Sequence, residues 1–96
     1  MDCQLLFTQR ALNDLAEIIG RIAEDDAEVA TRFGNSLLDH LDLLPRFPRM
    51  GGVVRKRSHI RKLVHSPILV YYTVQELERR IDILHFRHVA RKPARF

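Results

Sequence analysis

Residues 7–44, FTQRALNDLAEIIGRIAEDDAEVATRFGNSLLDHLDLL, contain the pattern of two amphipathic helices that follow each other almost without a loop. Thr8 offers a side-chain oxygen that can cap the first helix, which we expect to run to about Glu24. Asp25 and Glu28 have the spacing of a capping box, so the second helix is predicted to begin there. Two helices joined this tightly form a hairpin.

Each helix is predicted from apolar positions that recur every three or four residues and therefore share one helical face. In the first helix these positions are Ala11, Leu12, Leu15, Ile18, Ile19, Ile22 and Ala23; in the second they are Val29, Ala30, Phe33, Leu37, Leu38, Leu41 and Leu44. Prolines and a glycine pair then end the second helix, so residues 45–52, PRFPRMGG, are expected to form a loop.

Beyond residue 52 the pattern changes to that of strands, which are rich in Val, Ile, Tyr and Phe. The candidate strands are VVRKR at 53–57, HIRKLVH at 59–65, PILVYYTV at 67–74 and RIDILHFRHV at 80–89. Turns are expected at Ser58, at Ser66-Pro67 and at 75–79, which makes these strands an antiparallel meander. In the last strand, Ile81 and Ile83 are expected on one face, with Leu84 and Phe86 on the other.

These elements predict a single α+β domain spanning residues 1–96. Residues 4–7, QLLF, form a short first strand. This strand and the helix hairpin pack on a three- to four-stranded antiparallel sheet. The core is predicted to contain Leu15, Ile19, Phe33, Leu37, Leu41, Val70, Tyr72 and Ile83. Tyr71 and Tyr72 alternate across their strand, so one is expected in the core and the other exposed as a candidate stacking platform.

Composition indicates an ordinary soluble protein. Hydrophobic residues make up 46% of the 96 residues and charged residues 29%. A single cysteine, Cys3, excludes an internal disulfide and is expected to pack as a small apolar residue. With no signal peptide and no apolar run near the ~18 residues of a membrane span, we expect a cytoplasmic protein that does not contact the membrane.

The charge of the chain is divided between its two parts. Residues 1–44 carry nine acidic and three basic residues, a net charge of −6. Residues 45–96 carry three acidic and thirteen basic residues, a net charge of +10. Such a basic part attracts a polyanion, either nucleic acid or an acidic protein segment. A solvated basic face balanced by the acidic helices is the alternative.

Four segments in this order resemble the RelE/ParE superfamily of toxins from bacterial type II toxin–antitoxin operons. They are FTQRALNDLAEII at 7–19, FPRMGG at 47–52, IRKLVHSPILVYYTV at 60–74 and ILHFRHVAR at 83–91. The resemblance covers nearly the whole chain and implies the fold described above. It also implies one of two activities: RelE-like members cut messenger RNA on the ribosome, whereas ParE-like members poison DNA gyrase, as in plasmid stabilisation systems, without cutting anything themselves.

The ribonuclease pattern is only partly present. Metal-free RNA cleavage needs an acid, a base and cations that stabilise charge on the phosphate. The resemblance assigns these roles to Arg61, Lys62, His88 and Arg91. However, Leu69 stands where the family has an arginine, and no tyrosine follows the last strand.

The segment His88-Val89-Ala90-Arg91 resembles instead the ending of gyrase-directed members, so we favour the ParE-like branch, which is not an enzyme. The residues expected to contact the target are His88, Arg91, Lys92, Arg95 and Phe96. A ribosome-dependent endoribonuclease is the alternative, and a member that binds its antitoxin but has lost toxicity is a third hypothesis.

The resemblance also implies a partner, a small DNA-binding antitoxin with an acidic C-terminal segment that covers the basic surface. The residues expected to bind it are Arg55, Arg57, Arg61 and Arg87. No cofactor is implied. No metal site is predicted either, because the histidines at 59, 65, 85 and 88 have no carboxylate or cysteine at a ligand spacing.

Overall fold

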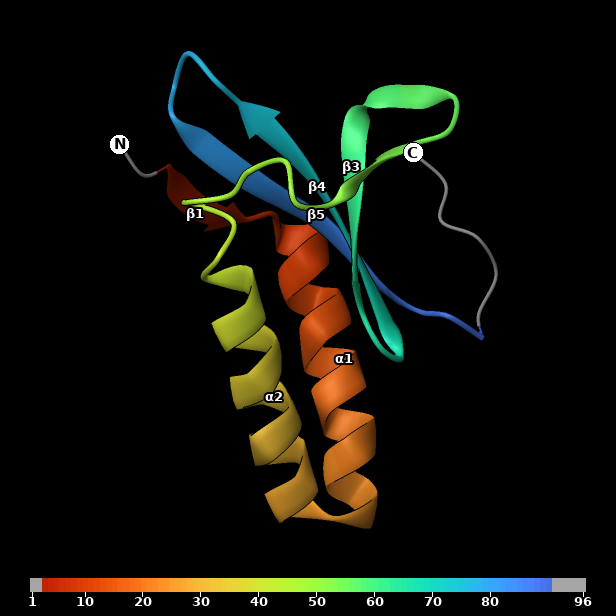
Figure 1. The fold of residues 1–96 in the computed structure, drawn as a ribbon. Coiled ribbons are helices and arrows are strands. Elements are labelled where there is room, and N and C mark those ends of the chain that lie inside the picture. Colours follow the sequence, from red (N-terminus) through yellow and green to blue (C-terminus); the bar gives the residue numbers. More distant parts are fainter. Residues whose placement is uncertain (1–2, 91–96) are drawn as a thin grey trace.

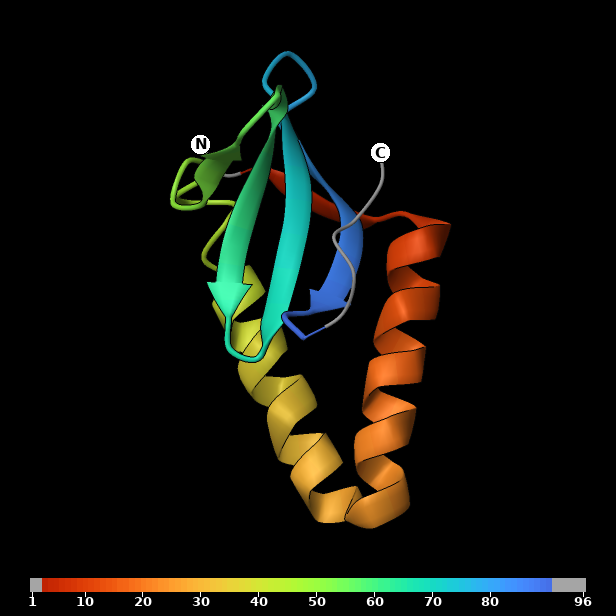
Figure 2. The ribbon, with the colours of Figure 1, turned by 90° about the vertical axis from the view of Figure 1, so that its right-hand side faces the viewer.

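The computed structural model describes residues 3–90, in which a strand, two helices and four further strands follow one another (Figure 1). The elements are β1 (Gln4–Phe7), α1 (Gln9–Asp25), α2 (Ala27–Leu41), β2 (Gly52–Val54), β3 (Arg57–His65), β4 (Ile68–Gln75) and β5 (Arg80–His88). The helix hairpin packs on the sheet and extends beyond it (Figure 2). The predicted α+β class is confirmed.

The five strands form one sheet in the order β1-β5-β4-β3-β2. β1 pairs in parallel with β5, and all other neighbours are antiparallel. The predicted three- to four-stranded antiparallel sheet is therefore one or two strands smaller than the observed sheet, and the prediction left β1 outside it. A parallel pair needs a long crossover connection, and the helix hairpin together with β2, β3 and β4 supplies it.

Side chains cap the starts of both helices. Thr8 caps α1 as predicted, since its hydroxyl accepts a hydrogen bond from a backbone N–H of the first turn. The cap of α2 is Asp26 rather than the predicted Asp25, and its Oδ1 accepts from the N–H of Glu28 at 2.9 Å. Among residues 3–90, no helix is both long and apolar enough to cross a membrane.

The turns between the strands agree with the predictions except at one place. Ser58, predicted to be a turn, lies inside β3. The turn that precedes β3 is formed by Arg55 and Lys56, and Lys56 adopts a φ of 72° in the left-handed region. The turns at 66–67 and 76–79 lie where the sequence predicts them.

The main core lies between the helices and one face of the sheet. Five of the predicted core residues are fully buried, namely Leu37, Leu41, Val70, Tyr72 and Ile83. Leu15, Ile19 and Phe33 are only half-buried. Leu15 and Phe33 pack against the margin of this core, and the helix hairpin continues past the ends of the strands (Figure 2).

β5 contains a bulge at Leu84. Ile83 and His85, on either side of it, pair with consecutive residues of β4, so Leu84 is an extra residue on its strand. The extra residue reverses the alternation of side chains. Phe86 therefore lies in the main core with Ile83, and the prediction that it shares a face with Leu84 is wrong.

Tyr72 joins the sheet to the loop between α2 and β2. Its hydroxyl donates to the carbonyl oxygen of Pro48 at 2.8 Å and accepts from the N–H of Gly51 at 2.9 Å. Burial raises the pKa of Tyr72, so the hydroxyl keeps its proton and remains a donor. A Cβ at position 51 would lie 2.7 Å from this hydroxyl oxygen, which explains the glycine.

We expect Leu37→Ala to lower the free energy of unfolding by about 2–5 kcal/mol, because it opens a cavity in the centre of the core. Leu37 is fully buried, whereas the adjacent Leu38 is 43% exposed. Leu38→Ala is therefore the matched control and should cost about 1 kcal/mol or less. Urea denaturation of both variants measures the difference, and equal losses would contradict the assigned packing.

Candidate functional site

The outer face of the sheet, opposite the main core, carries polar and basic side chains around a buried tyrosine. Facing residues on neighbouring antiparallel strands project on the same side. Lys62 of β3 faces Tyr71 of β4, which in turn faces His85 of β5. Arg87 lies two residues beyond His85 and shares this face. We call Lys62, Tyr71, His85 and Arg87 the outer-face row.

Contacts within the outer-face row fix the aromatic rings. Tyr71 stacks on His85 with ring centroids 5.8 Å apart. Arg87 donates to the hydroxyl oxygen of Tyr71 from Nε at 3.3 Å and from Nη2 at 3.2 Å. Tyr71 is buried in a small apolar cluster with Ile60 and Leu69. Because Tyr72 is buried as well, the prediction that one of the two tyrosines is exposed is wrong.

Asp14 of α1 holds the histidine of the outer-face row. Its Oδ2 accepts a hydrogen bond from Nδ1 of His85 at 2.5 Å and from the N–H of Phe86 at 3.2 Å. A carboxylate can only accept, so Nδ1 is the nitrogen that carries the proton. Nε2 is then the acceptor of the neutral ring, an arrangement that orients a histidine for proton transfer.

Sequence reasoning missed this role of Asp14, although one signal was present. Asp14 lies three residues after Ala11 and four before Ile18, which places a carboxylate on the apolar face of the first helix. A charge at such a position is stable only when it has hydrogen-bonding partners. Its partners belong to β5 and could not be identified from helical spacing alone.

The structure does not bring the predicted ribonuclease residues together. Arg61 and Lys62 are consecutive in β3 and project on opposite faces. The guanidinium of Arg61 donates to the carbonyl oxygen of Gly51 at 2.7 Å, so it supports the loop. His88 lies at the end of β5, where its Nδ1 accepts from a backbone N–H. Arg91 lies outside the described residues.

The predicted antitoxin-binding arginines also divide into two groups. Arg55 and Arg57 are exposed at the β2–β3 turn. Arg61 and Arg87 make hydrogen bonds within the chain, to the loop and to Tyr71 respectively. Of the predicted target-binding residues, Lys92, Arg95 and Phe96 lie outside the described residues, as Arg91 does.

Two histidines meet between α2 and the end of β3. Nδ1 of His40 lies 2.8 Å from Nδ1 of His65, and Phe33 packs edge-on against His65. One Nδ1 must donate and the other accept, so only one of the two Nδ1 atoms can carry a proton. Burial, and next the nearby charge of His40, lower the pKa of His65 from 6.5. Nothing in the sequence pattern signalled this pair.

Within residues 3–90, no three His, Cys, Asp or Glu side chains lie close enough together to hold a metal ion. The histidines considered in the sequence are dispersed. His59 is exposed on β3, whereas His65 meets α2 and His85 meets α1.

A comparison with protein families identifies the family of this chain. Residues 5–93 match the family described as the ParE toxin of the type II toxin–antitoxin system parDE. The chain belongs to the ParE toxin family. No curated protein matches it.

Solved structures from other toxin–antitoxin systems share the fold of this ParE-family chain. A chain of the chromosomal ParDE system of P. aeruginosa has a TM-score of 0.76 at 19% identity, with 90% of this chain and 95% of that chain covered. A chain of the M. tuberculosis RelBE2 complex has a TM-score of 0.62 at 23% identity, covering 92% and 99%. The isolated E. coli RelE toxin has a TM-score of 0.63 at 17% identity, covering 94% and 87%.

The expected RelE/ParE fold is thus confirmed, and the chain is a toxin of the type II toxin–antitoxin class. Identities this low show a common fold and nothing about the target. The ParE family member described here combines that fold with the outer-face row and its Asp14 contact. The choice between targets therefore depends on individual side chains.

Asp14→Ala is expected to lower the free energy of unfolding by about 1–3 kcal/mol, because two donors of β5 lose a charged acceptor. Asn13→Ala, at the neighbouring exposed position, is the matched control. Urea denaturation gives the stability, and hydrogen exchange of the Phe86 amide gives the local effect. Unchanged protection of that amide would show that Asp14 does not hold the bulge.

The His40–His65 contact predicts a stability that depends on pH. The pKa of His65 is lowered in the folded state, so below 6.5 the unfolded chain takes up a proton first. The stabilisation is complete above pH 6.5 and declines as the pH falls below it. Urea denaturation between about pH 5 and 8 should show a smaller decline for His65→Gln, with exposed His59→Gln as control. Equal declines in all three proteins would contradict this.

Proposed function

We propose that this ParE-family toxin inhibits DNA gyrase by binding it and has no nuclease activity of its own. The observation that carries the proposal is the match to the ParE family over residues 5–93, which includes the segment His88-Val89-Ala90-Arg91. Leu69 also supports it, because this buried side chain occupies the position at which the ribonuclease branch has an arginine.

We further propose that an antitoxin neutralises the toxin through an acidic segment. Two of the structures that share the fold are described as toxin–antitoxin systems, ParDE and RelBE2. The net charge of +10 over residues 45–96 supports a polyanionic partner. Arg55 and Arg57 are exposed and suited to such contacts. Association should weaken as the salt concentration rises.

The outer-face row supports a second candidate function, ribosome-dependent cleavage of messenger RNA. Lys62 and Arg87 would hold the charge of a phosphate, and His85 would transfer the proton of a 2′-hydroxyl. Asp14 orients this histidine, as in sites for acid–base chemistry. This set keeps Lys62 of the one expected from the sequence and replaces Arg61, His88 and Arg91 by His85 and Arg87, which share its face.

One pair of variants separates the two functions. Deletion of residues 92–96 removes none of the described core and should abolish inhibition of gyrase supercoiling while leaving the fold intact. Lys62→Ala removes an exposed amine of the outer-face row and should leave gyrase inhibition unchanged. The measurements are supercoiling of relaxed plasmid by purified gyrase, and cleavage of a defined message in a reconstituted translation reaction.

The nuclease reading predicts the opposite pattern. In that case the wild-type protein cuts the message on the ribosome and gyrase keeps its activity. Lys62→Ala then slows cleavage by roughly 10- to 1000-fold, the usual cost of losing one group that stabilises a transition state. Cleavage with this dependence on Lys62 would overturn our choice of target. Circular dichroism of both variants serves as the control for folding.

A further inference from the structure

Two histidines from different elements meet where the end of β3 lies beside α2 (Figure 2). Nδ1 of His40 in α2 lies 2.8 Å from Nδ1 of His65, the last residue of β3. Both residues are half-buried, so the pair is open to solvent on one side. Neutral imidazole nitrogens are the commonest ligands of transition metals in proteins. Neither the proposed binding of gyrase nor the alternative nuclease chemistry uses this pair.

The distance between the two Nδ1 atoms indicates which kind of ion fits them. Nitrogen ligands at ~2.0 Å from one ion lie about 2.8 Å apart at adjacent corners of a square plane and about 3.3 Å apart in a tetrahedron. The observed 2.8 Å therefore matches square-planar or tetragonal coordination. Cu²⁺ and Ni²⁺ favour this geometry with nitrogen and oxygen ligands, and Cu²⁺ binds most tightly among the divalent first-row ions.

An ion can bind only when both Nδ1 atoms have a free lone pair, and Ser36 allows this state. In the metal-free pair one Nδ1 carries a proton, so that ring must change to the tautomer protonated at Nε2, and both rings must turn toward a common point. Oγ of Ser36 lies 3.4 Å from Nε2 of His65. A hydroxyl can accept as well as donate, so it serves either tautomer of His65. Metal-ligating histidines usually have such a partner for their other nitrogen.

Packing already holds the two rings face to face. Leu37 and Leu41 are fully buried and fix the part of α2 that carries His40. Phe33 packs edge-on against His65, with ring centroids 5.7 Å apart. Binding an ion therefore requires rotation of two rings and no movement of either element. No third His, Cys, Asp or Glu of residues 3–90 joins the pair, so water completes the coordination.

We propose that His40 and His65 form a surface site for a divalent transition-metal ion, Cu²⁺ in preference to Ni²⁺, which both Nδ1 atoms bind. Exposed Asp39 precedes His40 in the chain and adds to the attraction of a cation. The ion joins α2 to the end of β3 and stabilises the folded chain, because the unfolded chain does not hold the two rings together. This site goes beyond the proposed function and requires neither gyrase nor an antitoxin.

Isothermal titration calorimetry with Cu²⁺ tests the site in the whole chain. All proteins carry Cys3→Ser, because a thiolate also binds copper. We expect one ion per chain with a dissociation constant in the micromolar range. His40→Gln and His65→Gln should each raise this constant at least ~10-fold, since one of two nitrogen ligands is lost. His59→Gln, at an exposed position of the same strand, should leave it unchanged. No binding in this range, or equal affinity in all four proteins, would overturn the proposal.

Two further measurements test whether both rings bind the ion in the folded chain. The electron paramagnetic resonance spectrum of bound Cu²⁺ should show two nitrogen ligands, a signal that His65→Gln removes. Cu²⁺ should also raise the urea midpoint of the protein with both histidines and leave that of His65→Gln unchanged. Each protein is compared with and without Cu²⁺, so a loss of stability caused by the substitution itself does not affect the result. An unchanged spectrum in His65→Gln, or equal stabilisation of both proteins, would contradict the assigned ligands.

Discussion

The carboxylate of Asp14 holds the first helix against the bulge of β5, and the other features of the structure depend on this contact. A bulge interrupts the hydrogen bonds between strands and leaves backbone groups that need other partners. Asp14 accepts from the N–H of Phe86, and the hydroxyl of Thr8 lies within hydrogen-bonding distance of the carbonyl oxygens of Ile83 and Leu84. Because Thr8 and Asp14 supply these partners, the first helix and the bulge stabilise each other. The chain that enters α1 is held beside β5, where β1 completes the sheet as a parallel strand.

The bulge also decides which chemistry each face of the sheet can have. In a regular strand that places Ile83 in the core, residue 85 would follow it there and residue 86 would point outward. The extra residue, Leu84, exchanges these directions, so Phe86 fills the core and His85 meets Tyr71 and Asp14 outside it. The outer-face row is thus a consequence of how the core is packed. A change that removed the bulge would move a histidine into an apolar core and a phenylalanine into solvent.

Local patterns in the sequence predict the elements well and their partners poorly. The helix hairpin follows from apolar spacing because each helix buries one face, and the loop follows from its prolines and glycines. The place of β1 depends on pairing with a strand more than seventy residues away, which no local pattern encodes. The bulge at Leu84 has no glycine to mark it. A count of charges also does not state where a side chain points: Arg61 and Arg87, both expected to bind the antitoxin, donate to groups of their own chain.

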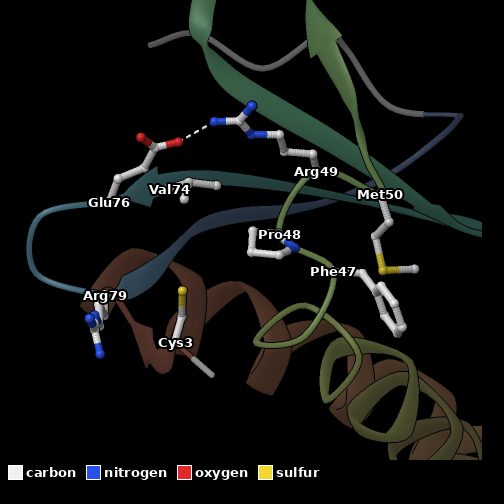
Figure 3. A pocket seen from close by; sticks show the side chains of 8 residues that line it. All are labelled: Cys3, Phe47, Pro48, Arg49, Met50, Val74, Glu76 and Arg79. Atoms are coloured by element: carbon white, nitrogen blue, oxygen red, sulfur yellow. Dashed lines mark hydrogen bonds and ion pairs between the residues drawn. The ribbon is translucent and has the colours of Figure 1, made fainter. Parts of the chain in front are cut away.

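Several cations of the basic part, residues 45–96, already have partners within the chain. Arg61 supports the loop, Arg87 holds Tyr71 and Arg80 pairs with Asp82, so the net charge of +10 overstates what a partner meets. The exposed remainder includes the β2–β3 turn with Arg55 and Lys56. Charges of this kind steer association and make it salt-dependent, but they discriminate poorly between acidic partners. Specificity must then come from shaped features, and the described chain offers two at separate places. One is the outer-face row on the sheet, and the other is the mainly apolar pocket lined by Cys3, Phe47 and Met50 (Figure 3). One fold can therefore serve toxins with unrelated targets, because a few side chains at such places can change without disturbing the core that α1 and β5 share.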